Sequence, residues 1–363
     1  MSNNNVGAPG LGAFGADSRV FAAFESLQRE FPGERLELGR VVAASREVYL
    51  LQTAAGETRG RPAGQLRAFG ELPVVGDWVA CKSAGPAAAS LVAFLPRRSQ
   101  LSRKVAGREV REQVVAANVD VALLVMGLDQ DYNLSRLERY SVMAWESGAE
   151  PVAVLTKADL CADPAAALLE VESLLPGVSA VALSALAGAG LDGLDRWLLP
   201  GRTLALLGSS GAGKSTLANA LLGAAKLSTG AVRAKDGRGR HTTTRRELLL
   251  LPGGALLLDN PGLREIQLWA EGEDGLDEAF EDIAALARQC RFSDCAHQRE
   301  PGCAVAAALH DGRLERRRLE SYFKLQRELR SLELRQDVVA RRRLERGFGL
   351  LSRQSQEAKR QRF

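Results

Sequence analysis

A nine-residue run, GSSGAGKST, constrains the fold of this chain more than any other feature of its sequence. The run fits the pattern G-x-x-x-x-G-K-[ST], follows the apolar segment TLALL and opens a segment with helical spacing. Glycines at such a strand-to-helix turn let backbone N–H groups wrap a phosphate, whose oxygens the lysine can reach. An ordinary glycine-rich turn is the alternative, which the strand and helix context disfavours. The predicted phosphate-binding residues are Gly208, Ser209, Ser210, Gly211, Ala212, Gly213, Lys214, Ser215 and Thr216.

The segments around this loop predict an α/β domain. From Asn118 onward, strongly apolar runs alternate with helical patterns, and the apolar runs are VDVALLVMGL, PVAVLTKAD, VSAVALSAL, TLALL, RELLLLP and GALLLDNPG. Near-continuous apolar strands joined by helices are typical of a mostly parallel sheet covered on both faces. Between Leu222 and Arg245 the chain is rich in Gly, Lys, Arg and Thr without an apolar period, which predicts a loop.

Composition divides the chain into further regions. Residues 1–34 are at first rich in Asn, Gly and Ala, which predicts a flexible extension with helical spacing only near Val20 to Glu30. Residues 35–97 hold short strand-like runs between Gly- and Pro-containing turns, which favours a small β barrel or sandwich. Trp78 lies in the alternating run VGDWVAC, so we expect it in the core rather than stacked on a base. The remaining predicted regions are 98–272 (α/β domain), 273–330 (helical with a cysteine cluster) and 331–363 (basic tail).

An acidic motif, DNPG, follows an apolar run about 45 residues after the phosphate-binding lysine. A P-loop enzyme keeps its Mg²⁺-linked aspartate at the end of such a strand, so we expect Asp259 to hold Mg²⁺ together with Ser215. The Gly262 amide could contact the terminal phosphate because glycine permits close backbone approach. An Asn-Pro-Gly turn without a ligand is the alternative.

Two motifs at predicted strand ends indicate guanine recognition. TKAD comprises Thr156, Lys157, Ala158 and Asp159, and its carboxylate can accept two hydrogen bonds from the N1–H and N2–H₂ edge of guanine. Adenine offers no such pair of donors. Ser184 and Ala185 begin a second motif, with Leu186 where GTPases have lysine in S-A-K. The usual GTPase form is N-K-x-D, so Thr156 lacks one side-chain amide.

Three cysteines and one histidine have the composition of a zinc site. Cys290, Cys295, His297 and Cys303 lie within fourteen residues and supply three thiolates and one imidazole. A complete set of four protein ligands leaves no position for a reactive water, so we expect one structural Zn²⁺. Unligated core cysteines are the alternative, and His310 is an alternative fourth ligand.

The order of the motifs is unusual, since TKAD and SAL precede the phosphate-binding loop and DNPG follows it. This order resembles a circularly permuted GTPase. The runs VVGDWV, RRSQLSR, AANVD and GRHTTT, with the cysteine cluster, resemble the ribosome small subunit-dependent GTPase A family over about residues 35–324. The resemblance implies an N-terminal OB-fold barrel, a permuted P-loop GTPase domain and a C-terminal zinc-binding helical domain. The N-terminal extension, Thr156 and the Arg-rich tail depart from the family pattern.

The GRHTTT run lies where GTPases keep the switch threonine that completes Mg²⁺ coordination when GTP is bound. Of its three threonines, we predict that Thr243 has this role. Leu263 follows DNPG, where a Ras-like enzyme carries a water-orienting glutamine. We therefore hypothesise that His241 orients the water, the alternative being a solvated or RNA-contacting histidine. The predicted catalytic residues are Lys214, His241, Thr243 and Asp259.

The net charge of +4 hides a basic C-terminus, since residues 313–363 hold 16 Lys and Arg against 7 Asp and Glu. This region either binds rRNA phosphates or forms a solvated helix, and the sequence leaves both open. No apolar run approaches the roughly 20 residues of a membrane span, and the first residues lack a signal-peptide pattern, so we expect a cytoplasmic protein. A monomer is the default expectation.

The resemblance implies a specific function for the chain. It implies a GTPase with GTP as substrate and Mg²⁺ as cofactor, whose partners are the 30S ribosomal subunit and 16S rRNA. The subunit would stimulate GTP hydrolysis during its own late maturation. Two alternatives remain open from the residues alone, namely an RNA-binding scaffold with a static nucleotide site and a P-loop ATPase of another pathway.

Overall fold

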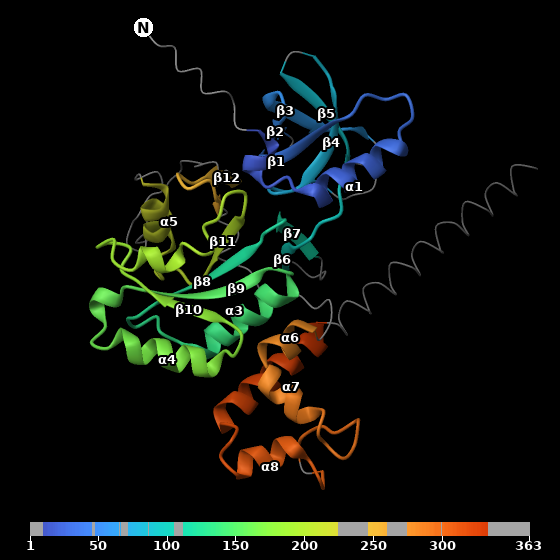
Figure 1. Ribbon diagram of the computed structural model, residues 1–363. Helices are drawn as coiled ribbons and strands as arrows, with labels where there is room; N and C mark the ends of the chain where they lie inside the picture. The colour runs from blue at the N-terminus through green and yellow to red at the C-terminus, as the bar shows by residue number, and fades with distance from the viewer. Residues whose placement is uncertain are drawn as a thin grey trace, which may run out of the picture.

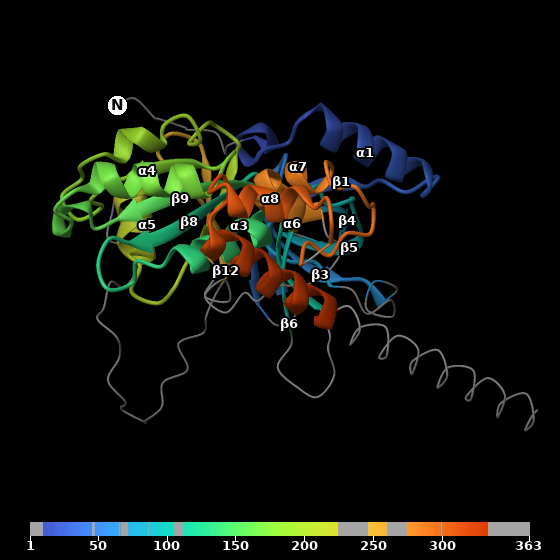
Figure 2. The same cartoon turned by 90° about the horizontal axis from the view of Figure 1, so that it is seen from below.

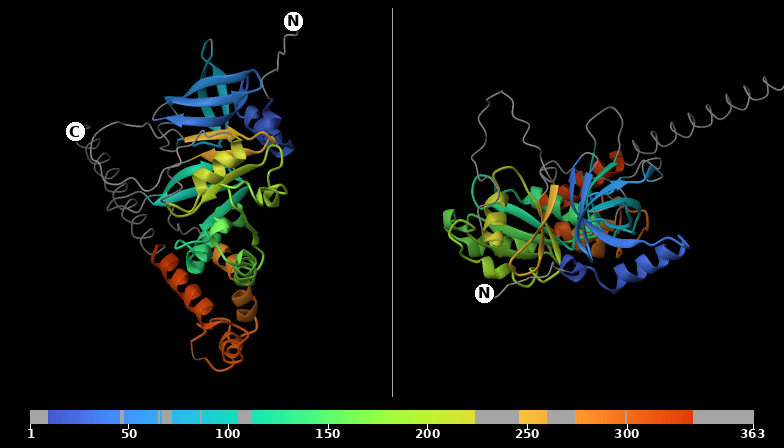
Figure 3. Two further views of the ribbon diagram at one scale, coloured as in Figure 1. Left: turned by 90° about the vertical axis from the view of Figure 1, so that its left-hand side faces the viewer. Right: turned by 90° about the horizontal axis from the view of Figure 1, so that it is seen from above.

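The computed structural model describes residues 10–45, 48–64, 66, 72–85, 87–104, 112–223, 246–259, 274–298 and 300–332. Three parts lie in a row: a β barrel, a central α/β sheet and a group of helices at the end opposite the barrel (Figures 1 and 3). The predicted α/β class, with an N-terminal barrel and a helical C-terminal domain, is confirmed. None of the described helices combines the length and apolarity needed to cross a bilayer.

Five strands close the N-terminal barrel. β1 (Glu37–Ser45) pairs antiparallel with β2 (Val48–Thr53) and β4 (Trp78–Ser83), while β3 (Gly56–Pro62) pairs with β2. β5 (Ala88–Phe94) completes the closure, parallel to β3 and antiparallel to β4. This strand order is that of an OB-fold, as predicted. The sequence GETRGRP of β3 has no apolar alternation, and its strand conformation comes from backbone pairing with two neighbours.

A helical segment packs on the outside of the barrel. It comprises the 3₁₀ helix η1 (Leu11–Phe14) and α1 (Ser18–Arg29), whose first turn is capped by the Asp17 carboxylate. Side chains of both helices join a buried cluster with Trp78, which is 2% exposed and therefore in the core, as predicted. Composition predicted a flexible extension over residues 1–34, whereas residues 11–29 are packed helices here because their apolar side chains have a barrel surface to cover.

The central sheet has the order β10-β9-β8-β11-β13-β12. The first five strands of this order are parallel, and β12 is antiparallel at the edge beside the barrel. The near-continuous apolar runs predicted this parallel sheet correctly, since β8 is buried along its whole length. The strands are β8 (Val121–Gly127), β9 (Glu150–Thr156), β10 (Ser179–Ala182), β11 (Thr203–Leu207), β12 (Arg246–Leu250) and β13 (Leu256–Asp259).

Helices cover both faces of this sheet. On β8, Leu124 and Met126 point to a cluster shared with α3 and α4, while Leu123 and Val125 point to a cluster shared with η3 and α5. This alternation is the period-two geometry of a strand with two buried faces. The covering helices are α3 (Leu134–Glu146), α4 (Pro164–Leu174), η3 (Leu191–Leu194) and α5 (Lys214–Leu222).

The barrel and the central sheet are joined by backbone pairing and by one buried arginine. β1 of the barrel pairs antiparallel with β12, so a single sheet runs through both parts. Arg40, on β1, is 1% exposed and donates hydrogen bonds to the carbonyls of Gly76 and Asn118 and to Thr203 Oγ1 at 2.8 Å. Burial lowers the pKa of Arg40 to about 10, so the guanidinium stays charged at neutral pH. A hairpin of β6 (Gln100–Lys104) and β7 (Glu112–Ala117) follows the barrel.

The C-terminal helices form their own core against α3. Val142 and Met143 of α3 belong to a buried cluster with side chains from the four C-terminal helical segments that the structure describes. Seen from below, α6 lies against α3 (Figure 2). These segments are α6 (Asp274–Ala279), α7 (Glu281–Ala287), α8 (Ala304–His310) and the helical residues 316–332.

A buried ion-pair network crosses the same interface. Glu138 of α3 has a fully buried side chain and accepts hydrogen bonds from Arg318 Nη1 at 3.1 Å and from Ser321 Oγ at 2.7 Å. Arg318 also binds both carboxylate oxygens of Asp282, at 3.1 and 2.8 Å, and the carbonyl of Ala279 at 2.8 Å. Its guanidinium lies 4.1 Å from the centre of a phenylalanine ring in the same cluster. One arginine therefore ties its own helix, residues 316–332, to three others, α3, α6 and α7.

Candidate nucleotide site and cysteine cluster

The predicted nucleotide motifs meet at one edge of the central sheet. β9, β8, β11 and β13 are parallel neighbours, so their carboxyl ends lie side by side. TKAD begins with the last residue of β9, the GSSGAGKST loop follows β11, and Asp259 ends β13. Ligands of open α/β sheets bind outside these carboxyl ends. The permuted chain order therefore still produces one site, because strand neighbours rather than sequence order decide which loops meet.

The phosphate-binding loop contains backbone conformations that glycine adopts readily and other residues do not. Gly208, Gly211 and Gly213 all have positive φ, at 155°, 88° and 93°. A Cβ at Gly208 would collide with the carbonyl of Val125, so only glycine fits there. Helix α5 begins at Lys214, whose ammonium donates to the carbonyls of Gly208, at 2.6 Å, and Ser209. The N–H groups at the start of α5 and the lysine ammonium thus face the same turn.

Thr156 connects TKAD to the phosphate-binding loop. Its side chain is buried, and Oγ1 donates to the carbonyl of Ala212 at 2.5 Å. The same oxygen lies 3.3 Å from the carbonyl of Met126 at the end of β8. A Cβ at Gly213 would lie 3.0 Å from this hydroxyl, so glycine and threonine fit closely. Although threonine lacks the amide of the usual asparagine, it makes a bond between the two motifs.

The residues predicted to recognise the guanine base lie in the loops that follow β9 and β10. Ala158 N–H donates to the carbonyl of Leu183 at 3.2 Å, which ties TKAD to the SAL segment. Lys157 is in the left-handed region with φ of 58°, and Asp159 follows in the short helix η2 (Ala158–Leu160) with an exposed side chain. Ser184 Oγ accepts from the N–H of Ala187 at 3.3 Å, which fixes the turn that contains Ala185. An exposed Asp159 carboxylate is accessible to a base.

Several predicted residues lie outside the described part of the chain. They are His241, Thr243 and Gly262. Asp259 is placed by its backbone at the end of β13. Conversely, Asp129 and Asp131 contact both nucleotide motifs, and our reading of the sequence missed them. A signal was present, since two carboxylates follow directly on the buried strand β8.

Removing the Thr156 hydroxyl tests its bond to the phosphate-binding loop. Replacing Thr156 by valine keeps the branched shape but leaves the Ala212 carbonyl without this donor. We expect the Kd for GTP to rise about fivefold, because one hydrogen bond contributes about 1 kcal/mol. Titration with a fluorescent guanine nucleotide measures the change, and Thr156→Ser, which retains the hydroxyl, is the control. Equal affinities of the valine variant and the wild type would contradict this role.

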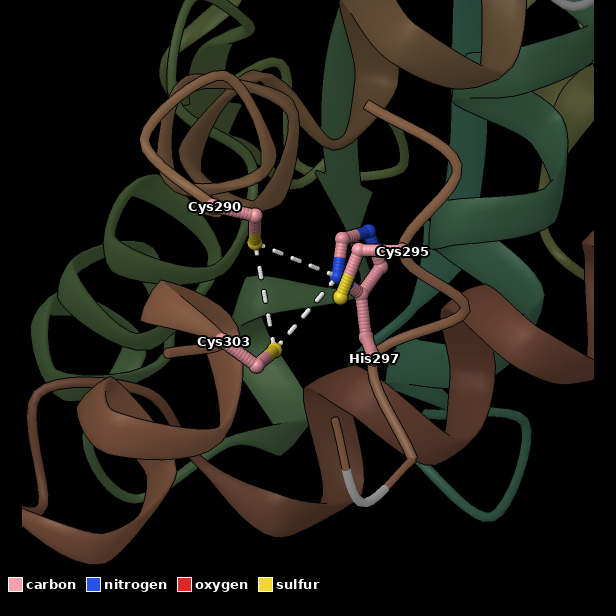
Figure 4. Close-up of side chains that lie close together, drawn as sticks. All are labelled: Cys290, Cys295, His297 and Cys303. Atoms are coloured by element: carbon pink, nitrogen blue, oxygen red, sulfur yellow. Dashed lines mark hydrogen bonds between the residues drawn. The ribbon is translucent and has the colours of Figure 1, made fainter. Parts of the chain in front are cut away.

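The cysteine cluster converges on one point (Figure 4). Nδ1 of His297 lies 3.6 Å from the Sγ atoms of both Cys290 and Cys303, which are 3.9 Å apart. The four ligand atoms, with Sγ of Cys295, lie within 4.8 Å of one another. Zn–S bonds of about 2.3 Å and Zn–N bonds of about 2.0 Å give tetrahedral edges of roughly 3.5–3.8 Å. The donor set and its spacing therefore fit a zinc ion.

Local backbone features hold these ligands. Cys303 precedes α8, and its Sγ accepts a hydrogen bond from the N–H of Ala306 at 3.3 Å, which fixes the position of the sulfur. His297 has a φ of 57°, and burial lowers its pKa, which favours the neutral imidazole that metals bind. His310, the alternative fourth ligand, has a side chain 90% exposed at the other end of α8 and is absent from the cluster.

Comparison with known proteins shows which family the chain resembles. Residues 94–269 match the model of the RsgA GTPase family. A protein of Opitutus terrae named small ribosomal subunit biogenesis GTPase RsgA is 47% identical over 92% of this chain and 93% of its own length. A Xylella fastidiosa protein of the same name is 48% identical over 88% of this chain and 91% of its own.

Solved structures agree as well. The crystal structure of YjeQ from Thermotoga maritima has a TM-score of 0.63 at 27% identity and covers 81% of this chain and 99% of that one. YloQ, whose structure is described as a circularly permuted GTPase, shares the fold with a TM-score of 0.60 at 22% identity and covers 82% of this chain and 96% of that one. The fold, the motif order and these matches define a circularly permuted P-loop GTPase. The chain belongs to the RsgA GTPase family.

Proposed function

We propose that this GTPase assists the biogenesis of the small ribosomal subunit, binding the 30S particle and hydrolysing GTP to GDP and phosphate. Relatives at 44–48% identity, matched over most of this chain, carry the name small ribosomal subunit biogenesis GTPase. The observation that carries the proposal is the convergence of the phosphate loop and TKAD through the Thr156–Ala212 hydrogen bond. An RNA-binding scaffold that never hydrolyses GTP is the contrasting function.

The site residues have distinct proposed roles in binding GTP. The backbone N–H groups of the loop from Gly208 to Thr216 would surround the phosphates, and Lys214 would release its carbonyl partners for phosphate oxygens. Ser215 and Asp259 would hold Mg²⁺, which supplies charge neutralisation when bound. The exposed Asp159 carboxylate would accept the N1–H and N2–H₂ of guanine, beside the loop of Ser184 and Ala185. Gly262 would contact the terminal phosphate.

The proposed chemistry is in-line attack of water on the γ-phosphate. Lys214 would stabilise the charge that develops on the phosphate oxygens. We propose His241 as the group that orients the water and Thr243 as the switch threonine. Since Leu263 stands where a Ras-like enzyme has glutamine, we expect slow intrinsic turnover that rises when the small subunit is bound.

The proposed rRNA contact lies on the last described helix. The exposed side chains of residues 316–332 include Arg316, Lys324, Arg327 and Arg330. Lysines and arginines on one face can neutralise phosphates, which makes affinity depend on salt. We propose that this face contacts 16S rRNA while the protein acts as a monomer in the cytoplasm.

Phosphate release from GTP and ATP, with and without purified 30S subunits, tests the proposed function. We expect release from GTP only, stimulated by 30S. Release from both nucleotides would count against the proposed role of Asp159, and GTP release that ignores 30S would refute the ribosomal coupling. Absence of hydrolysis under every condition would favour the scaffold.

We also propose one structural Zn²⁺ at Cys290, Cys295, His297 and Cys303. Elemental analysis of the purified protein is expected to give about one zinc per chain, and Cys303→Ser is expected to lose it together with part of the helical CD signal. Zinc binding to such a small segment contributes directly to its folding. Cys161→Ser is the matched control, since this half-buried cysteine lies outside the cluster and should leave the zinc content unchanged. A wild-type protein without zinc would refute the site.

A further inference from the structure

A short loop between β8 and α3 touches both nucleotide motifs. Residues 128–133 lie between the phosphate-binding loop and TKAD, because β8 is the strand between β11 and β9. The N–H of Leu128 donates to the carbonyl of Thr156 at 2.8 Å, and Asn133 caps the start of α3. The loop is therefore anchored at both ends. Its two carboxylates, Asp129 and Asp131, belong to neither of the motifs that define the GTPase site.

Asp131 reaches the phosphate-binding loop. Its Oδ2 accepts a hydrogen bond from Ser209 Oγ at 2.5 Å. The other oxygen, Oδ1, forms an ion pair with Arg136 in the first turn of α3. The side chain of Asp131 is 17% exposed, so water competes little for these contacts. A hydrogen bond to an ionised group is stronger than one between neutral groups. Ser209 is thereby tied to the β8–α3 loop.

Asp129 reaches TKAD in the same way. Its Oδ2 binds Lys157 Nζ at 2.6 Å, and its Oδ1 accepts from the N–H of Asp131 at 3.0 Å. The hydrogen bond from Lys157 holds the pKa of the Asp129 carboxyl below its usual range. A Cβ at Gly127 would lie 2.7 Å from Asp129 Oδ1, so the glycine that ends β8 leaves room for this carboxylate. One loop thus fixes a residue of each motif.

The carboxylates of Asp129 and Asp131 could either repel a nucleotide or restrain the two loops, and the charges beside them decide between these effects. Two free carboxylates beside a phosphate site would repel the nucleotide, since like charges close together disfavour each other. Here Lys157 pairs with Asp129 and Arg136 pairs with Asp131, so each negative charge has a cationic partner. The remaining effect is geometric, because these contacts restrict the rotamers of Lys157 and Ser209 in the two predicted nucleotide motifs.

We infer that Asp129 and Asp131 are positioning residues, which hold the phosphate-binding loop and the base-recognition loop in register before a guanine nucleotide binds. The inference rests on the proposed nucleotide roles of these two loops. A site that is ordered in advance loses less conformational freedom on binding, and that difference appears as affinity. Asp131 acts through Ser209, and Asp129 acts through Lys157.

A double-mutant cycle between Asp131 and Ser209 tests the inference in the full-length protein. GDP affinity is measured for the wild type, Asp131→Asn, Ser209→Ala and the double variant. We expect each single variant to weaken GDP binding about tenfold, and the double variant to be no weaker than either single one. Ser209→Thr retains a hydroxyl and is expected to recover most of the affinity. Asp129→Asn is expected to weaken binding about tenfold through the other half of the loop.

Controls separate positioning from loss of folding. Asp195→Asn changes an exposed carboxylate that follows η3 and should leave the affinity unchanged. Thermal unfolding identifies any variant that is destabilised, and Ser209→Ala, a small change at a partly exposed position, keeps the test valid if Asp131→Asn fails to fold.

Three results would overturn the inference: unchanged GDP affinity in the single variants, tenfold effects that multiply in the double variant, or tighter binding by Asp131→Asn, which would indicate repulsion. Failure of the wild type to bind GDP would instead refute the proposed nucleotide site.

Discussion

Replacing Arg318 by alanine is expected to lower the free energy of unfolding by about 3–5 kcal/mol. Arg318 is almost completely buried and binds Glu138, Asp282 and the carbonyl of Ala279 at once. Without it, the fully buried carboxylate of Glu138 keeps Ser321 and a 3.7 Å contact to Arg317, which is partly exposed. Removing one partner of a buried pair leaves a charge in a poorly solvated place, and this penalty exceeds the loss of the pair itself.

Urea denaturation followed by far-UV CD measures this effect. Arg316→Ala is the matched control, because Arg316 lies on the same helix with an exposed side chain and should change stability by less than about 0.5 kcal/mol. The urea concentration at the midpoint of unfolding of the C-terminal helices is expected to fall, since the network joins these helices to α3. An Arg318 variant as stable as the Arg316 variant would show that the network contributes little.

Replacing Lys214 by alanine is expected to lower kcat for GTP hydrolysis by about 10²–10³-fold. The ammonium group lies at the start of α5 and already donates to carbonyls of the phosphate-binding turn. In that position it can stabilise the negative charge that develops on the phosphate oxygens. The helix N–H groups alone do not supply a full positive charge. The expected loss is that of one preorganised electrostatic contact to the transferred phosphoryl group.

Single-turnover phosphate release with 30S subunits measures the rate constant for this variant. Lys214→Arg is expected to restore little activity, because a planar guanidinium does not fit a turn built for a compact ammonium. Lys82→Ala, which removes a partly exposed cation of the barrel paired with Glu34, is the control and should hydrolyse GTP at the wild-type rate. Wild-type turnover by the alanine variant would show that another group stabilises the phosphate charge.

The sequence was sufficient to predict the features whose residues lie close together in the chain. The phosphate-binding loop could be predicted because its glycines and lysine are adjacent in the chain, and three of its glycines have the positive φ that this turn requires. The cysteine cluster could be predicted because all four side chains fall within fourteen residues. The parallel sheet followed from apolar runs too long for one-sided strands. Each of these features is encoded over a few residues.

Other features depend on contacts between distant residues. The packed helices before the barrel were predicted to belong to a flexible extension, because its first residues are rich in Asn, Gly and Ala and the barrel surface that the helices cover is formed by residues elsewhere in the chain. The strand β3 carries no alternation of its own and exists through its pairing with β2 and β5. Glu138 and Arg318 are 180 residues apart, and no sequence pattern near either residue predicts their ion pair.

The nucleotide site shows the same division. The sequence by itself determined where the predicted phosphate-binding loop lies, at Gly208–Thr216, and which motifs accompany that loop, since those signals are short turns at strand ends. Only the tertiary structure decided that Asp129 and Asp131 join the phosphate and base loops, because this contact requires β8 to lie between β9 and β11. Strand order depends on the packing of the whole sheet, and no local pattern of residues carries it.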